Sequence, residues 1–365
     1  MHNTLNPHDI WHYPRQDTAT KLITALDIGA VTSMVIFAPR RIGKTEFLIR
    51  DLKPIAIKHN YHVVYFNFHA DKHNQDSVES FLEELRHEVN NGILSKIDIK
   101  EVNLPWCRIN LKTQKVNELD INQLLSLLVI KLQRKNQKLL LLLDEIQELS
   151  FKPKYSWFIG SLRTALDVNK QNISVVFTGS SRGGLMNMFQ NSKAPFFHFS
   201  ANFEFEYFNK DFTDFLADNY KKILGKPIDK KQLYEVFCRL GRITLYIREI
   251  INIKILNPDW SLNDVYEYYI AQISEPDKYQ ELWHNFSDAE KSILVATSQK
   301  FGQIYSSEFV KLAEQHGFTV TRGQLQYAIK KLTNNSFVTI NPSNEYEIID
   351  PYLKNWIIDN IVIKG

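Results

Sequence analysis

The sequence predicts an α/β fold in which a parallel sheet is covered by helices on both faces, with smaller domains after it. Short runs that are apolar throughout have the composition of strands buried on both faces. They are "SMVIF" (33–37), "HVVYFNF" (62–68), "LLLLLDE" (139–145) and "ISVVFTGSS" (173–181). Stretches with helical periodicity separate these strands, as in a βαβ sheet. The later strands end in polar residues, at the sheet edge where such folds bind ligands.

Helices are expected between the strands, at 44–59, 76–90, 121–134 and 155–169. The segment 91–120 has no clean period, so it is interpreted as an insertion without an assigned role.

Two further domains are expected after the sheet. The core takes residues 1–208, and apolar periodicity predicts a helical lid at 209–282. Three helices followed by two strands predict a winged-helix domain at 283–365. Two of its helices begin with the spacing of a capping box, in the pairs Ser287 with Glu290 and Thr321 with Gln324.

Composition indicates a soluble cytoplasmic protein. Of the 365 residues, 44% are hydrophobic and 23% are charged, and the formal net charge is +3. Cys107 and Cys238 are the only cysteines, which argues against a disulfide framework or a cysteine zinc site. The sequence shows neither a signal-peptide pattern nor an apolar run long enough to span a membrane.

A glycine-containing loop, "APRRIGKTE", follows the first predicted strand and opens a helix. Backbone N–H groups and the helix dipole favour phosphate in that context. Gly43 allows close approach, Lys44 would reach the β- and γ-phosphates, and the Thr45 hydroxyl would ligate Mg²⁺. The alternative is a strand–turn–helix connection without a ligand. The nucleotide interpretation assigns to binding the residues Ala38, Pro39, Arg40, Arg41, Ile42, Gly43, Lys44, Thr45 and Glu46.

Two adjacent acids end the leucine strand. Asp144 is placed to hold Mg²⁺, and Glu145 is placed to polarise an attacking water. Acids that merely face solvent are the alternative, but their position downstream of Gly-Lys-Thr favours the catalytic interpretation. Together the two motifs predict hydrolysis of ATP or GTP.

Hydroxyl groups end the next strand, in "FTGSSRGG". Thr178 and Ser180 are placed to sense the γ-phosphate and orient water, although Ser180 would equally cap a helix. Arg163 and Arg182 are candidates for stabilising transition-state charge from a neighbouring subunit.

These motifs resemble the prokaryotic P-loop ATPases related to the AAA+ and STAND groups, of the archaeal type. The resemblance is carried by "FAPRRIGKTEFL", "LLLLLDEIQEL", "VVFTGSSRGGLMNMF" and "EYEIIDPYLKNWI", and it covers about Pro14 to Trp356. It implies a P-loop NTPase sheet, ATP with Mg²⁺, and the roles given above for Lys44, Thr45, Asp144 and Glu145. It also implies that the stretch 13–15 closes over the adenine, and that Ala38 is a family variant.

Two features depart from the family pattern. The stretch "APFFHF" (194–199) has no arginine where many members carry one. The lid motif Gly-Gly-x-Pro reads "GRIT", with Arg242 in the second position and Thr244 in place of proline. Arg242 is a candidate second sensor that reaches phosphate from the lid, with simple solvation as the alternative.

The winged helix raises the question of a DNA partner. "TRGQLQYAIKKLTNN" would be the groove helix, with Arg322, Lys330 and Lys331 on or beside it, and "NPSN" would be the wing. Residues 283–365, however, hold 8 Lys/Arg and 8 Asp/Glu, whereas DNA-reading modules usually carry a basic excess. DNA contact, protein contact and autoinhibition all stay open.

The sequence favours an ATP-hydrolysing switch or motor of the AAA+/STAND type. Nucleotide bound between core and lid would then control the assembly of a homo-oligomer or the docking of a protein partner. The alternative function is an ATP-gated DNA-binding accessory or regulatory protein in replication, mobile-element or defence biology. No membrane partner is expected.

Overall fold

The computed structural model describes residues 9–69, 76–90, 101–104, 107–110, 115–273, 276–301, 304–335, 337–340 and 345–362. Contacts divide the chain into two compact units. The first consists of Pro14–Ala38 and Lys44–Phe205, and the second of Met1–Tyr13, Pro39–Gly43 and Glu206–Gly365. Within the described stretches, no helix combines the length and apolar character needed to cross a membrane.

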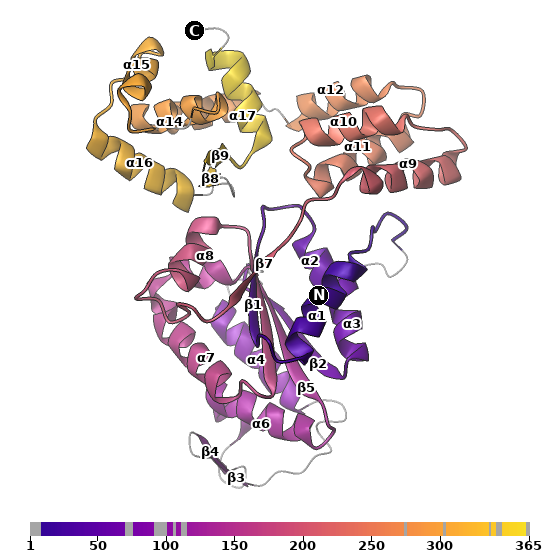
Figure 1. Cartoon of the computed structure of the whole chain (residues 1–365), viewed down its shortest axis with the longest axis vertical. Helices are drawn as coiled ribbons and strands as arrows, with labels where there is room; N and C mark the ends of the chain where they lie inside the picture. The colour runs from indigo at the N-terminus through magenta and orange to yellow at the C-terminus, as the bar shows by residue number, and fades with distance from the viewer. Residues whose placement is uncertain are drawn as a thin grey trace. The chain divides into compact units, whose positions relative to one another are not determined.

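A parallel five-stranded sheet forms the centre of the first unit (Figure 1). The strand order is β2-β5-β6-β1-β7, so β6 lies between the strand of the glycine loop and the strand of the two acids. The strands are β1 (Ser33–Phe37), β2 (Tyr61–Asn67), β5 (Lys138–Asp144), β6 (Ile173–Gly179) and β7 (Ala201–Glu204).

The register of the sheet brings the functional strand ends together. Asn67 of β2 pairs with Asp144 of β5, and Gly179 of β6 pairs with Phe37 of β1. All four strands are parallel, so their carboxyl ends meet at one edge of the sheet. The residues that follow β1, β5 and β6 are those singled out by the sequence.

Helices cover both faces of the sheet because its central strands are apolar on both sides. Leu139, Leu141 and Leu143 pack in one core cluster with α4, α6 and α7, while Leu140 and Leu142 are equally buried outside that cluster. The helices of this unit are α1 (Gln16–Asp27), α2 (Lys44–Glu46), a π-helical turn (Phe47–Leu52), α3 (Lys53–Lys58), α4 (Ser77–Asn90), α6 (Ile121–Gln133), α7 (Ser156–Val168) and α8 (Arg182–Phe189). Short 3₁₀ turns occupy Val116–Glu118, Ile146–Phe151 and Pro153–Tyr155.

The four predicted strands are confirmed, each within two residues at either end. Strand β7 and helix α1 were not predicted. β7 is a four-residue edge strand whose side chains are mostly exposed, so it has no apolar run to reveal it. The insertion 91–120 contains a hairpin of β3 (Glu101–Leu104) and β4 (Cys107–Asn110); its residues 91–100, 105–106 and 111–114 lie outside the described part.

The second unit contains the helices predicted to form the lid and the elements predicted to form the winged-helix domain. The lid helices are α9 (Lys210–Leu224), α10 (Lys230–Arg239), α11 (Thr244–Leu256) and α12 (Leu262–Ile273). They are followed by α13 (Pro276–Asn285), α14 (Asp288–Ser298), α15 (Ser307–Gln315), α16 (Arg322–Asn334), β8 (Val338–Ile340), β9 (Tyr346–Ile348), α17 (Pro351–Ile357) and a π-helical turn (Ile358–Val362).

The winged-helix elements agree with the sequence. The pairs Ser287 with Glu290 and Thr321 with Gln324 form the predicted capping boxes of α14 and α16. β8 and β9 pair in an antiparallel ladder, while the turn "NPSN" (341–344) lies outside the described residues. Lys331 on α16 forms an ion pair with Glu290 on α14 at 3.0 Å, which ties two of the three helices together.

Candidate nucleotide site

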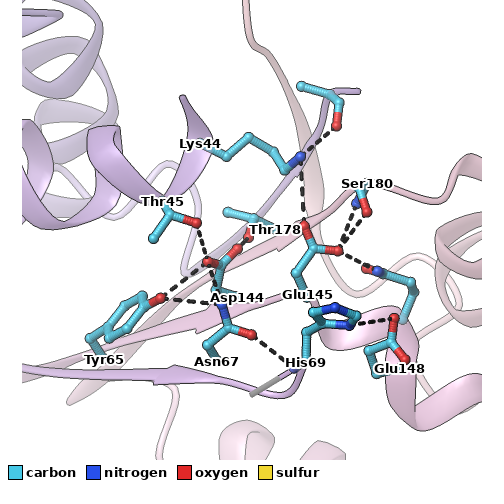
Figure 2. A network of polar contacts seen from close by, with 12 residues as sticks. Lys44, Thr45, Tyr65, Asn67, His69, Asp144, Glu145, Glu148, Thr178 and Ser180 are labelled. Atoms are coloured by element: carbon cyan, nitrogen blue, oxygen red, sulfur yellow. Dashed lines mark hydrogen bonds and ion pairs between the residues drawn. The ribbon is translucent and has the colours of Figure 1, made fainter. Parts of the chain in front are cut away.

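Asp144 is the centre of a polar network at the carboxyl edge of the sheet (Figure 2). Its side chain is fully buried. One carboxylate oxygen, Oδ2, accepts hydrogen bonds from the Thr45 hydroxyl at 2.7 Å, the Tyr65 hydroxyl at 3.1 Å and the Asn67 amide at 3.1 Å. The other oxygen accepts from the Thr178 hydroxyl. The carboxylate is therefore fixed in orientation from four directions, which makes it a rigid anionic ligand.

The residues Thr45 and Asp144 fit a magnesium ion. Mg²⁺ prefers oxygen ligands in a compact shell, and the Thr45 hydroxyl lies 2.7 Å from the buried Asp144 carboxylate. Thr45 is an exposed residue, so it lies where a ligand that approaches the loop can reach it. The structure thus brings together the two predicted metal ligands, one from the glycine loop and one from β5 (Figure 2).

Lys44 is held at the start of α2 by two oxygen atoms. Its ammonium group donates to the carbonyl oxygen of Ala38 at 2.7 Å and lies 3.7 Å from Oε1 of Glu145. The side chain is buried, so its positive charge is not dispersed into solvent. The Lys44 ammonium group is therefore held in one position beside Glu145. A positive charge fixed at the loop is what binding of a phosphate there would require.

Glu145 is oriented by residues from the next strand. Ser180 donates to Oε2 of Glu145 twice, from its hydroxyl at 2.6 Å and from its backbone N–H at 3.2 Å. Gln147 donates to the same oxygen. Glu145 itself adopts a left-handed backbone conformation (φ 53°), which a non-glycine residue tolerates only where its surroundings fix it. Oε1 is therefore directed to Lys44 and Oε2 to Ser180 (Figure 2).

Tyr65, Asn67 and Gln147 were missed by the sequence reasoning. Tyr65 and Asn67 are two residues apart on β2, so both point to the same side of the sheet. Burial raises the pKa of Tyr65, with the neighbouring Asp144 charge acting in the same direction. The signal was present, since Asn67 is a polar residue at the carboxyl end of a predicted strand.

A tight approach at Gly179 explains the glycine in "TGSS". A Cβ placed on Gly179 would lie 2.3 Å from Oε1 of Gln147 and 2.9 Å from the Leu185 side chain. The backbone between Thr178 and Ser180 can follow its path only without a side chain there. Gly179 therefore sets the positions of the two hydroxyl residues that hold the acids.

The loop residues 39–43 group with the second unit. Gly43 has φ 95°, a conformation that favours glycine. Arg41 is also left-handed (φ 67°), and its guanidinium donates to the Tyr246 hydroxyl at 3.0 Å. Arg40 is exposed, Ile42 is buried, and Glu46 pairs with Arg50 along the helix that follows.

The partners of Arg242 and Arg163 belong to the same unit as the arginine itself. Arg242 donates to the carbonyl oxygens of Tyr207 and Phe208, before α9, so its role as a second sensor stays a prediction. Arg163 pairs with Asp167, stacks on Phe199 and donates to the Pro195 carbonyl. The side chain of Arg182 lies outside the described residues.

The predicted adenine segment divides between the two units. Tyr13 packs against the rings of Phe208, Phe212 and Phe215 at the start of the lid. Arg15 lies over the ring of Phe205, 4.2 Å from its centroid. The contact of this segment with adenine stays a prediction.

The fold and the loop–acid constellation define a P-loop ATPase with a C-terminal winged helix. Residues 14–250, more than half of the chain, match the family described as "ATPase domain predominantly from Archaea", and residues 277–359 match "Probable winged helix domain". The chain belongs to this archaeal-type ATPase family. No curated protein matches the sequence.

Two solved structures share the fold over nearly the whole chain. The Walker-type ATPase PABY2304 of Pyrococcus abyssi superposes with a TM-score of 0.68 at 18% identity, covering 94% of this chain and 95% of its own. The Aeropyrum pernix ORC2 protein, in ADPNP–ADP complexes, superposes with a TM-score of 0.59 at 16% identity, covering 98% of both chains. At these identities the likeness concerns the fold.

Proposed function

We propose that this chain binds ATP with Mg²⁺ on the loop 38–46 and hydrolyses its β–γ phosphoanhydride bond. The observation that carries the proposal is the convergence of Lys44 and Thr45 with Asp144 and Glu145 at one edge of the sheet. Membership of an ATPase family supports hydrolysis. Nucleotide in the ORC2 complexes supports binding on this fold.

Each side chain has a distinct part in the proposed reaction. Thr45 and Asp144 would hold Mg²⁺, which when bound neutralises phosphate charge. Lys44 supplies a fixed positive charge at the loop, where anionic oxygens of the nucleotide bind. Glu145 would accept a proton from the attacking water, with its carboxylate oriented by Ser180 and Gln147 at Oε2 and by Lys44 at Oε1. Thr178 keeps Asp144 in place.

The proposed biological role is that of a switch. Occupation of the phosphate loop would change the disposition of the lid and winged-helix domain and so control assembly or the docking of a protein partner. The grouping of loop residues 39–43 with the lid and the winged helix supports this role. Light scattering after size exclusion, with and without ATP, measures assembly directly; a mass that does not respond to ATP argues against the assembly form of the switch.

An ATP-gated DNA-binding function is the second candidate, and the winged-helix match favours it. Arg322, Tyr327 and Lys330 are exposed on α16, the helix that would enter a groove. Lys331, in contrast, is paired with Glu290. A gel shift that weakens steeply with salt, together with ATPase stimulation by DNA, would favour this candidate over a protein partner.

ATP binding is tested by removing the loop cation. Lys44→Ala should abolish ATP binding measured by titration calorimetry, because no other buried cation in the described core lies beside Glu145. Lys58→Ala, an exposed lysine on α3, is the matched control and should bind like wild type. Micromolar ATP affinity retained by Lys44→Ala would refute the assignment of the loop.

A further inference from the structure

The turn Gly241–Tyr246, which opens α11, contacts two distant segments of its unit at once, in addition to the stretch 207–208 that Arg242 binds. One is the phosphate loop at Arg41 and Ile42, and the other is the segment 350–352 at the start of α17. The turn therefore joins three parts of the chain that are far apart in sequence.

On the loop side, three hydrogen bonds hold the turn. The Leu245 N–H donates to the Arg41 carbonyl at 3.1 Å, and the Thr244 hydroxyl donates to the Ile42 carbonyl at 3.2 Å. The Arg41 guanidinium donates to the Tyr246 hydroxyl at 3.0 Å. Thr244 thus ties the start of α11 to the loop through its side chain as well as through the neighbouring backbone.

The conformation of Arg41 depends on these bonds. Its φ of 67° lies in the left-handed region, which a long side chain adopts only when its surroundings enforce it. Arg41 is fixed both through its carbonyl, by Leu245, and through its guanidinium, by Tyr246. A change in the loop would therefore have to break or shift both attachments.

On the winged-helix side, the contacts are apolar and aromatic. A Cβ on Gly241 would lie 3.4 Å from Pro351, so the turn and Pro351 are in close contact. The rings of Tyr246 and Tyr352 are 5.0 Å apart, and both side chains are buried. The same Tyr246 thus packs on the winged helix with its ring and accepts from the phosphate loop with its hydroxyl.

A carboxylate completes the joint. Asp350 caps α17 by accepting from the Tyr352 N–H at 2.9 Å, and it accepts from the Tyr279 hydroxyl at 3.1 Å. Its charge also acts on the Arg41 guanidinium, whose pKa is lowered by burial but raised by more through Tyr246 and Asp350. Asp350 therefore favours the charged Arg41 through its field, while the contact that holds Arg41 in the joint is its hydrogen bond to Tyr246.

We propose that Arg41 is a positioning residue for which the bound phosphates and the Asp350–Tyr246 joint compete, so that ATP loosens the attachment of the winged helix. This inference rests on the proposed function and names the regulation of that same site. A ligand shifts a conformational equilibrium only through different interactions with the two states. Arg41 would be held by phosphate in one state and by its hydrogen bond to Tyr246 in the other, which supplies that difference.

The proposal makes the coupling reciprocal. If phosphate weakens the joint, then weakening the joint must favour phosphate by the same factor. Asp350→Asn removes the competing charge, while asparagine still caps a helix and accepts from Tyr279. The lost attraction is that of a charge acting on a partly exposed guanidinium without direct contact, so ATP affinity should rise about twofold.

Hydrogen exchange of the full chain, with and without the ATP analogue ADPNP, tests the proposal at the joint. In wild type, ADPNP should increase exchange in the peptide 346–357. In Tyr246→Phe, which keeps the ring packed on Tyr352 but loses the hydroxyl, exchange there should be raised already without ADPNP and change little on adding it. Tyr268→Phe is the matched control, since this tyrosine is 41% exposed on α12, and it should behave like wild type.

The outcomes separate this inference from the proposed function. ADPNP binding with unchanged or lowered exchange at 346–357 in wild type overturns the inference alone, and so does a Tyr246→Phe variant that responds like wild type. A wild-type chain that fails to bind ADPNP in calorimetry overturns the proposed function and this inference with it. If circular dichroism shows that Tyr246→Phe does not fold, the ATP affinity of Asp350→Asn is the deciding measurement. An affinity that is unchanged or weaker than that of wild type contradicts the proposed competition for Arg41.

Discussion

The hydrogen bond from Thr178 to Asp144 offers a quantitative test of the buried network. Thr178→Val replaces the hydroxyl with a methyl group of similar size and leaves Asp144 with its bonds from Thr45, Tyr65 and Asn67. A hydrogen bond to a charged group contributes about 1.5–3 kcal/mol. The added methyl group returns about 0.8 kcal/mol by apolar burial. The net destabilisation of the first unit should be about 1–2 kcal/mol.

Urea unfolding followed by circular dichroism measures this loss. With a slope of about 2–3 kcal/mol per molar urea, the midpoint should fall by about 0.5 M. Thr164→Val is the matched control, because Thr164 is exposed on α7 and bonds only within its own helix. Its effect should stay within about 0.5 kcal/mol. Equal midpoints for Thr178→Val and Thr164→Val would refute the inferred strength of the Asp144 network.

Three further perturbations test other parts of the account. A Cβ on Gly43 would meet no neighbouring atom, but Gly43→Ala forces an L side chain onto a backbone with φ 95°. The substitution should therefore cost about 1–3 kcal/mol of backbone strain in the loop and weaken ATP binding measured by calorimetry. Undiminished ATP affinity would argue against this loop conformation. Gly179→Ala should lower the rate of phosphate release, because the added methyl group would displace Gln147 and Ser180 from Glu145. A wild-type rate would contradict the close packing of Gly179 against Gln147. The pKa of Glu290 is raised by burial but lowered by more through Ser287 and Lys331, so the stability it contributes is present above its ordinary pKa of 4.5 and lost as pH falls below it. Acid unfolding of the winged helix should be less steep in Glu290→Gln; an unchanged pH profile would exclude that contribution.

The sheet was predictable because its central strands are uniformly apolar. The β5 leucines read as a strand buried on both faces, and all five are fully buried. β7 was not predictable, since an edge strand with exposed side chains has no such pattern. The strand order could not be predicted either, because apolar periodicity indicates where strands and helices lie in the sequence but not which strands pair.

The site was predictable where a motif fixes it. Lys44, Thr45 and Asp144 converge as the loop and strand motifs predict. Ser180, for which the sequence left open a γ-phosphate sensor or a helix cap, donates a hydrogen bond to Glu145. Tyr65 required the β2–β5 register, which places Asn67 opposite Asp144. The partners of Arg41 lie some two hundred residues away in the lid, and no local pattern could have identified them.

The central claim, that Glu145 activates water for ATP hydrolysis, is tested most directly by Glu145→Gln. The change keeps the shape of the side chain and its contact with Ser180 but removes the proton-accepting carboxylate. Calorimetry and phosphate release should be measured on the same preparation, with Glu83→Gln, an exposed glutamate on α4, as the control. The account predicts that Glu145→Gln binds ATP with wild-type affinity and releases phosphate at least about 100-fold more slowly, as expected for loss of a general base. Hydrolysis at the wild-type rate would contradict it.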